Sequence, residues 1–241
     1  MRIIRTRNYK ELSEMAANMI LAQVILKPDS VLGLATGGSP VGTYDKIAEA
    51  YRRGNVDFSQ VTSINLDEYR GLSRKHEQSY WHFMQEHLFR HINIRPDHIF
   101  IPDGENPDSE DACVQYDRMI AEAGGIDMQL LGIGLDGHIG FNEPGDYFEL
   151  DTHCVDLTES TIEANKRFFN CKEDVPGQAY TMGVRPIMQA KKVVMIANGK
   201  NKAEILHRAF AGPVTPKVPA SILRLHPDFI LIADEDALSQ I

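Results

Sequence analysis

A histidine lies between two carboxylates in the glycine-rich segment 132–144, which contains Asp136, His138 and Glu143. Histidine is the side chain best suited to moving protons near neutral pH. One carboxylate can fix the tautomer of such a histidine, and another can raise its basicity. Because the glycines let this segment fold back on itself, we expect the three side chains to converge as an acid–base catalytic group.

Three other interpretations of this segment stay open. Gly132, Gly134 and Gly137 match the spacing of a dinucleotide-binding loop, but that motif needs a helix to begin at once, and Pro144 makes a helix unfavourable. An Asp–His–Glu set could bind a metal. Its spacing matches no common metal signature and no Cys–His set accompanies it, so we predict no metal. The histidine could also simply pack in a turn.

A second glycine-containing turn, Thr36-Gly37-Gly38-Ser39, lies between a predicted strand and a predicted helix. Paired glycines let a ligand approach the backbone closely, and the free N–H groups of a first helical turn favour an anion. We expect Ser39 to cap the helix and Pro40 to be its first residue. The turn predicts a phosphate site, with a tight βα turn as the alternative. It is not an ATP-binding loop of the Gly-Lys-Ser/Thr type.

Two adjacent acids, Asp67 and Glu68, directly follow another apolar segment that we predict to be a strand. In a parallel sheet, the carboxyl end of such a strand lies at the ligand crevice. A carboxylate that is partly buried there could act as a general base, because burial raises its pKa. A solvated acidic turn or a helix cap is the alternative.

Arg167 and Lys202 are the cations that we expect to face an anionic substrate. Arg167 belongs to a basic pair beside two phenylalanines. Lys202 lies just after a predicted strand, at the N-terminus of a predicted helix, where the helix dipole disfavours a cation. A bound phosphate would relieve that conflict, so the position of Lys202 indicates an anion site.

The composition limits the partners of the protein. The 241 residues include 25 Lys+Arg and 34 Asp+Glu, and a net charge of −9 argues against nucleic acid or an anionic membrane as the main partner. The N-terminus lacks the apolar core of a signal peptide, and no apolar run approaches the roughly 20 residues that span a bilayer. Three cysteines without a Cys-x-x-Cys pair favour a reducing compartment. We therefore predict a cytoplasmic protein that acts on a small molecule.

Predicted strands alternate with predicted helices along the chain. We expect strands at 30–34, 61–66, 99–101, 128–133, 193–197 and 229–233, and helices at 8–26, 40–53, 79–91, 107–123, 158–169 and from 201. This alternation is typical of a mainly parallel sheet that is covered on both faces. We predict an α/β fold with a single doubly wound, Rossmann-like domain over residues 1–241. Its loops at 35–40, 67–78 and 134–145 then lie at the carboxyl edge of the sheet.

Together these segments resemble the glucosamine-6-phosphate deaminase family, also called the glucosamine-6-phosphate isomerase family. The matching segments appear in family order and cover nearly the whole chain: 34–40, 65–69, 134–144, 164–169 and 199–203. The run Asp-Gly-His-Ile-Gly-Phe-Asn-Glu-Pro is highly specific, whereas Thr-Gly-Gly-Ser alone is not.

The resemblance implies conversion of glucosamine 6-phosphate and water to fructose 6-phosphate and ammonia, in the catabolism of amino sugars such as N-acetylglucosamine. It assigns the opening of the sugar ring to His138, by proton transfer to the ring oxygen, with Asp136 and Glu143 orienting the histidine. It makes Asp67 the base that takes the proton from C2 of the open-chain sugar and delivers it to C1.

The resemblance also implies that the turn of Thr36, Gly37, Gly38 and Ser39 holds the phosphate, together with Arg167 and Lys202. An aldose–ketose isomerisation needs one base that reaches both C1 and C2 and a second group for the ring oxygen. Neither a metal nor a redox cofactor is required for that chemistry, so we expect no cofactor.

Residues 145–155 depart from the allosteric members of the family. Those members bind N-acetylglucosamine 6-phosphate between subunits through basic residues soon after the Asn-Glu-Pro element. Here the segment contains acids and no Lys or Arg, and the chain is shorter at its C-terminus than the allosteric hexamers. We expect no activation by that ligand, and a monomer rather than a hexamer.

Two alternative functions remain at the level of the sequence. A 6-phosphogluconolactonase is a hydrolase of similar fold with a related Gly-rich loop, but it needs no C2 base and lacks the Phe-Asn-Glu-Pro run, so Asp67 argues against it. A non-enzymatic sugar-phosphate sensor, as in some transcription regulators, would usually carry a DNA-binding segment, and we expect this chain to begin at the catalytic domain.

Overall fold

A parallel sheet forms the centre of the computed structural model, which describes residues 1–166, 169, 171 and 174–241. Within these residues the sheet has seven strands in the order β1-β10-β9-β6-β2-β3-β5, and every pair is parallel. In chain order the strands are β1 (Arg2–Thr6), β2 (Val31–Leu34), β3 (Thr62–Asn65), β5 (Ile99–Phe100), β6 (Met128–Leu131), β9 (Lys192–Ala197) and β10 (Phe229–Asp234).

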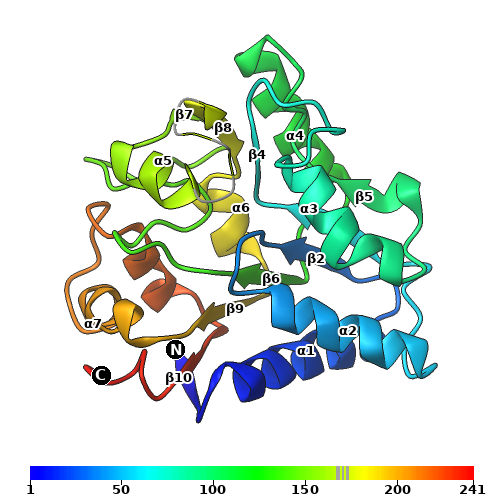
Figure 1. The fold of residues 1–241 in the computed structure, drawn as a ribbon, viewed down its shortest axis with the longest axis horizontal. Coiled ribbons are helices and arrows are strands. Elements are labelled where there is room, and N and C mark those ends of the chain that lie inside the picture. Colours follow the sequence, from blue (N-terminus) through cyan, green and yellow to red (C-terminus); the bar gives the residue numbers. More distant parts are fainter. Residues whose placement is uncertain (167–168, 170, 172–173) are drawn as a thin grey trace.

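Helices cover both faces of this sheet (Figure 1). The first layer contains α1 (Tyr9–Leu26), α2 (Val41–Arg52), α3 (Tyr80–His87) and the short η1 (Phe89–His91). The second contains α4 (Ser109–Glu122), α6 (Val184–Gln189), α7 (Ala203–Phe210) and η6 (Pro219–Leu225). Along β9, Val194 packs against the first layer and Met195 against the second, because successive side chains of a strand point to opposite faces. The predicted doubly wound α/β fold is confirmed.

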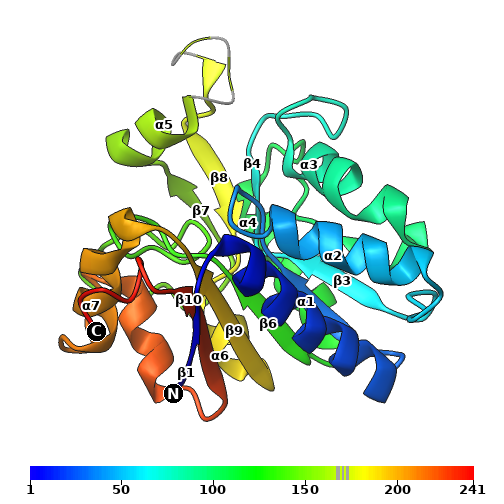
Figure 2. The same ribbon diagram turned by 60° about the horizontal axis from the view of Figure 1, so that its bottom comes forward.

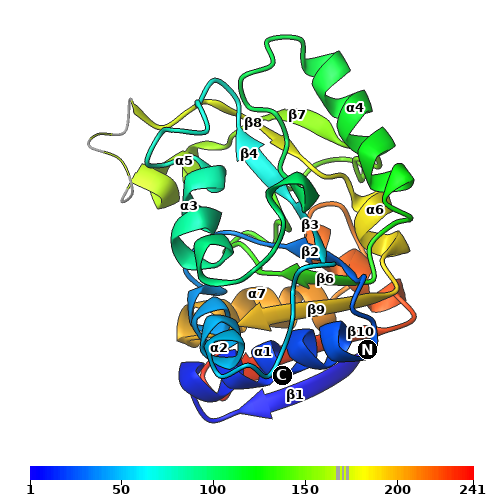
Figure 3. The ribbon, with the colours of Figure 1, turned by 90° about the vertical axis from the view of Figure 1, so that its right-hand side faces the viewer.

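A smaller antiparallel sheet, which the sequence pattern did not predict, lies beside the central one (Figures 2 and 3). It has the order β4-β8-β7, and α5 packs near it. Its elements are β4 (Asp67–Tyr69), β7 (His153–Asp156), α5 (Glu159–Asn165) and β8 (Gln178–Thr181). The expected loop at 67–78 therefore begins with a strand, and the main chain passes from one sheet to the other at Leu66.

The strand order reverses direction at β2, which has β3 on one side and β6 on the other. In open α/β sheets such a reversal leaves a crevice outside the carboxyl ends of the strands, and ligands bind there. The turn at 35–40 follows β2, Asp67 follows β3, and the glycine-rich segment follows β6. The topology therefore brings the three predicted loops to the same crevice.

The N-terminus of α2 differs from the prediction by one residue. Pro40 occupies the N-cap and the helix begins at Val41, so the expectation that Ser39 caps the helix is wrong. Tyr9 of α1 takes over the role: its hydroxyl accepts from the N–H of Gly42 at 2.8 Å and lies 3.1 Å from the Ser39 carbonyl oxygen. A tertiary contact has replaced the local side-chain cap.

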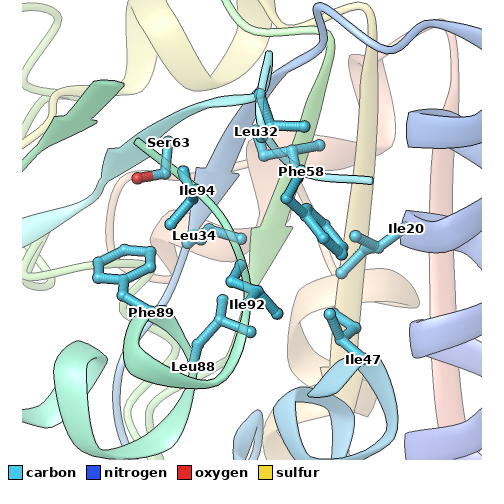
Figure 4. A pocket seen from close by; sticks show the side chains of 11 residues that line it. Ile20, Leu32, Leu34, Ile47, Phe58, Ser63, Leu88, Phe89, Ile92 and Ile94 are labelled. Atoms are coloured by element: carbon cyan, nitrogen blue, oxygen red, sulfur yellow. The ribbon is translucent and has the colours of Figure 1, made fainter. Parts of the chain in front are cut away.

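A gap of about 10 Å³ remains between the first helix layer and the sheet (Figure 4). Apart from Ser63 its lining is apolar, with side chains such as Ile20, Phe58 and Phe89 pointing into it. Such a volume holds at most about one water molecule. A sugar phosphate cannot be accommodated in this gap. No helix in the described part of the chain has the length and apolar character to cross a bilayer.

Candidate active site

His138 lies between the two carboxylates that the sequence predicts to surround it. Its Nδ1 atom is 2.8 Å from Asp136 Oδ1 and 3.7 Å from Glu143 Oε2. The backbone N–H of His138 also donates to Asp136 Oδ1 at 3.1 Å. The structure therefore brings these three predicted residues together on one loop.

Glycines make this convergence sterically possible. The imidazole of His138 lies directly on Gly134, where a Cβ atom would come within 2.3 Å of the ring. Gly137, with φ +98°, turns the chain, and its N–H donates to the Gly134 carbonyl oxygen at 3.2 Å. A side chain at position 134 would displace the histidine from between its carboxylates.

Glu143 is held from outside its own loop. Its side chain is 8% exposed, and Oε1 accepts from the hydroxyl of Thr161 on α5 at 2.6 Å. The hydroxyl of Thr158, at the N-cap of the same helix, lies 3.4 Å from that oxygen. The helix beside the second sheet therefore positions one of the two carboxylates that face His138.

The electrostatics of this group favour a protonated histidine. Burial by itself lowers the pKa of His138, but the hydrogen bonding and negative charge of Asp136 and Glu143 outweigh burial and raise the pKa to about 9. Burial would likewise raise the pKa of Asp136, but the hydrogen bonding and positive charge of His138 hold it well below its ordinary value. The group is an imidazolium with a carboxylate partner, which is a proton donor at neutral pH.

The same three residues also have the spacing of a cation site, because one ligand atom from each lies within 4.8 Å of the others. A metal ligand must be a neutral imidazole. The raised pKa of His138 instead keeps its proton, and the 2.8 Å separation from Asp136 is that of a direct ion pair. The geometry therefore fits an acid–base group better than a metal centre, and the absence of a metal remains a prediction.

Asp67 is 6% exposed and is the first residue of β4. Gly140 of the glycine-rich loop lies against it, since a Cβ atom there would be 3.4 Å from Asp67 Oδ2. Burial and the charge of Glu68 raise the pKa of Asp67 to about 8, against the opposing charge of His138. A buried carboxyl with a pKa near neutrality is suited to general base catalysis. The alternative of a solvated acidic turn is wrong.

Glu68 is also buried, at 2% exposure, and it caps a helix, which was the second alternative that the sequence left open for this acidic pair. Its carboxylate accepts three backbone hydrogen bonds of 2.9 Å, from the N–H groups of Tyr69, Tyr80 and Trp81. Burial raises the pKa of Glu68 to about 7, although the three N–H groups and Arg74 oppose the shift. The only sequence signal for Glu68 was its position beside Asp67 after an apolar strand.

The turn of Thr36, Gly37, Gly38 and Ser39 has an open surface. A Cβ atom at either glycine would meet nothing within 4 Å, and Gly37 has a φ of +97°, which favours glycine. Thr36 interacts through its side chain with the hydroxyl of Tyr80 on α3. The turn therefore combines free space with backbone N–H groups near a helix N-terminus, as an anion site requires.

Lys202 is the last residue of η5 (Lys200–Lys202) and the N-cap of α7, so it lies at a helix N-terminus as predicted. Its ammonium group donates to the carbonyl oxygen of Ile133 at 2.6 Å. Because Ile133 immediately precedes Gly134, this bond ties Lys202 to the glycine-rich loop. Arg167, the other predicted cation, lies outside the residues that the structure describes.

Residues 145–155 form one wall of a second cavity, of about 320 Å³. Acids line it, among them Glu143, Asp146, Glu149 and Asp156, and its described lining contains no Lys or Arg. Asp146 pairs with Lys217 at 2.6 Å. A cavity of this character repels an anion.

The fold and the site define an α/β protein with an imidazolium and a buried carboxyl group at the switch point of a parallel sheet. The sequence signature of the glucosamine-6-phosphate isomerases/6-phosphogluconolactonase family matches residues 7–230, and the chain belongs to this family.

Individual relatives agree with this family. The chain is 58% identical, over 232 residues, to a glucosamine-6-phosphate deaminase of Lachnoclostridium phytofermentans, which covers 96% of this chain and 98% of that protein. A solved monomeric glucosamine-6-phosphate deaminase matches with a TM-score of 0.98 and 41% identity over 100% of both chains. A 6-phosphogluconolactonase from Trypanosoma cruzi matches with a TM-score of 0.81 over 100% of this chain and 96% of that one, at 19% identity. The last comparison shows a shared fold alone.

Proposed function

We propose that this protein is an enzyme that converts glucosamine 6-phosphate and water to fructose 6-phosphate and ammonia. The observation that carries this function is the pairing of a buried carboxyl, Asp67, with a protonated histidine, His138, at one crevice. The full-length relatives that bear the name glucosamine-6-phosphate deaminase support the same activity.

His138 opens the sugar ring in this mechanism. The imidazolium donates its proton to the ring oxygen as the bond between that oxygen and C1 breaks, and C1 becomes an aldehyde. Asp136 and Glu143 keep the ring oriented and favour its protonated state. A general acid with a pKa somewhat above neutrality is charged when the substrate arrives and can still release its proton.

Asp67 then moves a proton between neighbouring carbons. Its carboxylate takes the proton from C2 while the aldehyde oxygen takes a proton from water, which gives an enol with the amine on C2. The proton returns to C1, C2 becomes an imine, and water adds to C2 as ammonia leaves. One base within reach of both carbons suffices for the two transfers, so the step requires no cofactor.

The phosphate group binds at the turn of Thr36, Gly37, Gly38 and Ser39 in this proposal, with Lys202 and Arg167 as the cations. The N-terminus of α2 directs its dipole toward this turn, and the glycines leave room for the ligand. Lys202 also holds Ile133, and a phosphate bound to Lys202 would therefore be coupled to the position of the catalytic loop.

We further propose that the chain acts as a one-domain cytoplasmic monomer in amino-sugar catabolism, including that of N-acetylglucosamine. The solved relative with a TM-score of 0.98 is a monomeric deaminase. The acidic lining of the cavity at residues 145–155 supports the view that no anionic effector binds there.

The nearest alternative is a 6-phosphogluconolactonase, because the family includes both activities. A lactone hydrolase has no need of a base for C2, whereas this site buries Asp67 and raises its pKa to about 8. The test is to incubate the purified protein separately with glucosamine 6-phosphate and with a phosphosugar lactone. We expect ammonia from the first. A folded preparation that releases no ammonia but hydrolyses the lactone would overturn the proposal.

A further inference from the structure

Glu68 connects the catalytic strand with the helix above the crevice. It lies on β4 between Asp67 and Tyr69, and its carboxylate accepts from the N–H groups of Tyr80 and Trp81, the first two residues of α3. The stem of Glu68 fits against Gly104, where a Cβ atom would come within 3.1 Å of Glu68 Cγ. The side chain is thus enclosed on both sides.

The start of α3 depends on this carboxylate. The first four N–H groups of a helix have no partner within the helix. Here Ser79 N–H donates to the His76 carbonyl oxygen at 3.0 Å, and His82 N–H donates to the Ser79 hydroxyl at 3.1 Å. The remaining two, at Tyr80 and Trp81, both donate to Glu68. A carboxylate at this position also matches the positive end of the helix dipole.

Tyr80, the first residue of α3, touches all three loops of the site. Its hydroxyl interacts with Thr36 of the glycine turn. Its ring lies 4.9 Å from that of Tyr69 on β4 and stacks at 6.0 Å, with an interplanar angle of 11°, on Phe141 of the catalytic loop. Because Glu68 holds the backbone of Tyr80 in place, it also holds the contacts that Tyr80 makes with the turn at 36–39 (the phosphate turn), with β4 (the base strand) and with the loop that carries His138 (the histidine loop).

Glu68 is also the negative charge nearest in sequence to Asp67. The titratable groups that interact electrostatically with Asp67 are Glu68 on its own strand, His138 on the glycine-rich loop, and the tyrosines of the surrounding elements, Tyr44, Tyr69, Tyr80 and Tyr116. The tyrosines are neutral at neutral pH. The charge felt by Asp67 is therefore set by Glu68 and His138, which act in opposite directions.

We propose, on the basis of the function given above, that Glu68 is a positioning residue: it anchors the first turn of α3 over the three loops and supplies a negative charge next to the base Asp67 on β4. It does not touch the reacting atoms in this account. Its effect on catalysis passes through the orientation of Tyr80 and the protonation of Asp67.

The direct test is a carboxyl-carbon NMR titration of Asp67, assigned with Asp67→Asn, in the wild type and in Glu68→Gln. Removal of a neighbouring like charge should lower the titration midpoint of Asp67 by about one pH unit. Ser79→Ala is the matched control, because it removes the other side-chain cap of α3 and no charge. It should leave the midpoint unchanged. Equal midpoints in Glu68→Gln and the wild type would overturn the electrostatic part of the proposal.

Glu68→Asp distinguishes the effect of the negative charge from the effect of the side-chain length. This variant also provides the test if Glu68→Gln does not fold. It keeps the negative charge, so the midpoint of Asp67 should stay high. Its shorter stem cannot reach α3 as well, so the amide protons of Tyr80 and Trp81 should exchange at least about tenfold faster than in the wild type. Unchanged protection of these amides would overturn the anchoring role.

Activity gives the third measurement. In Glu68→Gln the acid limb of the kcat/KM profile should move down with the midpoint of Asp67, and KM should rise, because Tyr80 no longer supports the phosphate turn. A lower activity with an unmoved limb would indicate a merely structural role. If the wild type released no ammonia, the proposed function would fail, while the titration and exchange measurements would still decide the role of Glu68.

Discussion

The base strand β4 and the histidine loop shift the pKa values of their titratable groups, Asp67 and His138, by opposite means. Asp67 lies on β4 among apolar groups and tyrosines, and burial, with the charge of Glu68, raises its pKa to about 8. His138 is flanked by Asp136 and Glu143, and their charges overcome burial to raise its pKa to about 9. Burial opposes ionisation of the first group, whereas partner charges promote ionisation of the second. The result is a base and an acid whose pKa values lie close together.

This contrast predicts where substitutions have their effects. In the proposed mechanism, a change at Asp67 should remove the group that moves the carbon-bound proton. A change in the histidine loop should affect ring opening, either directly or through the charge on His138. A change far from both regions should affect stability alone.

Asp67→Asn should reduce kcat by about 10³- to 10⁴-fold, because an amide cannot accept the proton of C2. The phosphate turn is untouched, so binding of the phosphosugar should persist. Steady-state assays and calorimetric binding check both points. Activity within tenfold of the wild type would remove Asp67 from the role of base.

His138→Gln should reduce kcat on cyclic glucosamine 6-phosphate by about 10²-fold, because the ring oxygen loses its proton donor. A substrate analogue that cannot form a ring does not need this step. The loss measured with such an analogue should therefore be much smaller. Equal losses on both substrates would show that His138 acts after ring opening.

The pH profile of kcat/KM should be a narrow bell with limbs near 8 and 9. Activity rises as Asp67 loses its proton, at a pKa of about 8, and falls as His138 loses its proton, at a pKa of about 9. Asp136→Asn removes a charge that favours imidazolium and should lower the alkaline limb by about one unit, which is more than it should move the acid limb. If both limbs moved equally, the two regions would not be tuned separately.

Asp127→Asn should destabilise the fold by about 1–3 kcal/mol and leave kcat unchanged. The buried carboxylate accepts from Val31 N–H at 2.8 Å and pairs with Lys27 at 2.6 Å and Lys191 at 2.8 Å. Both lysines are substantially exposed, so solvent screening limits what the ion pairs contribute. Burial would raise the pKa of Asp127, but the hydrogen bonds and charges of the lysines lower it.

The sign of the resulting pH dependence follows from that lowered pKa. The stabilisation by Asp127 is present above the ordinary pKa of an aspartate and is lost as the pH falls through the lower folded value. The difference in the free energy of unfolding between the wild type and Asp127→Asn should therefore become smaller at acidic pH. Urea melts at neutral and acidic pH measure it, and a gap that widens in acid would contradict the assignment.

N-acetylglucosamine 6-phosphate should have no effect on the dependence of rate on substrate concentration, which should be hyperbolic. The cavity at residues 145–155 is lined by acids and would repel a phosphate. Rate measurements with and without this compound check the point. A sigmoidal curve that the compound relieves would refute it.

The sequence predicted the parts of the molecule that have strong local signals. Apolar runs such as those of β2 and β6 predicted the buried parallel strands, and the glycine pattern predicted the convergence around His138. The small sheet was missed because β7 is half-exposed and β4 has only three residues, so neither shows an apolar run. The N-terminal strand β1 was missed because its two adjacent isoleucines lie between arginines and most of the strand is exposed at the sheet edge, so it shows neither an apolar run nor an alternating pattern.

Long-range contacts account for the remaining differences. Asp67 and Glu68 are equally acidic in the sequence, but only the fold shows that Glu68 is occupied by the N–H groups of α3. Similarly, Ser39 is a good cap by type, yet Tyr9, thirty residues earlier in the chain, has taken over that position in space. Residue type and spacing cannot show which of two possible partners occupies a position in the folded protein.

Turnover of glucosamine 6-phosphate in deuterated water follows the proton that Asp67 is proposed to move. We expect the wild type to release ammonia and to form fructose 6-phosphate with deuterium at C1, because Asp67 exchanges its proton with solvent between C2 and C1. We expect neither product nor label with Asp67→Asn. Deuterium at C1 with Asp67→Asn at the wild-type rate, or a folded wild type that forms no ammonia, would contradict the proposed mechanism.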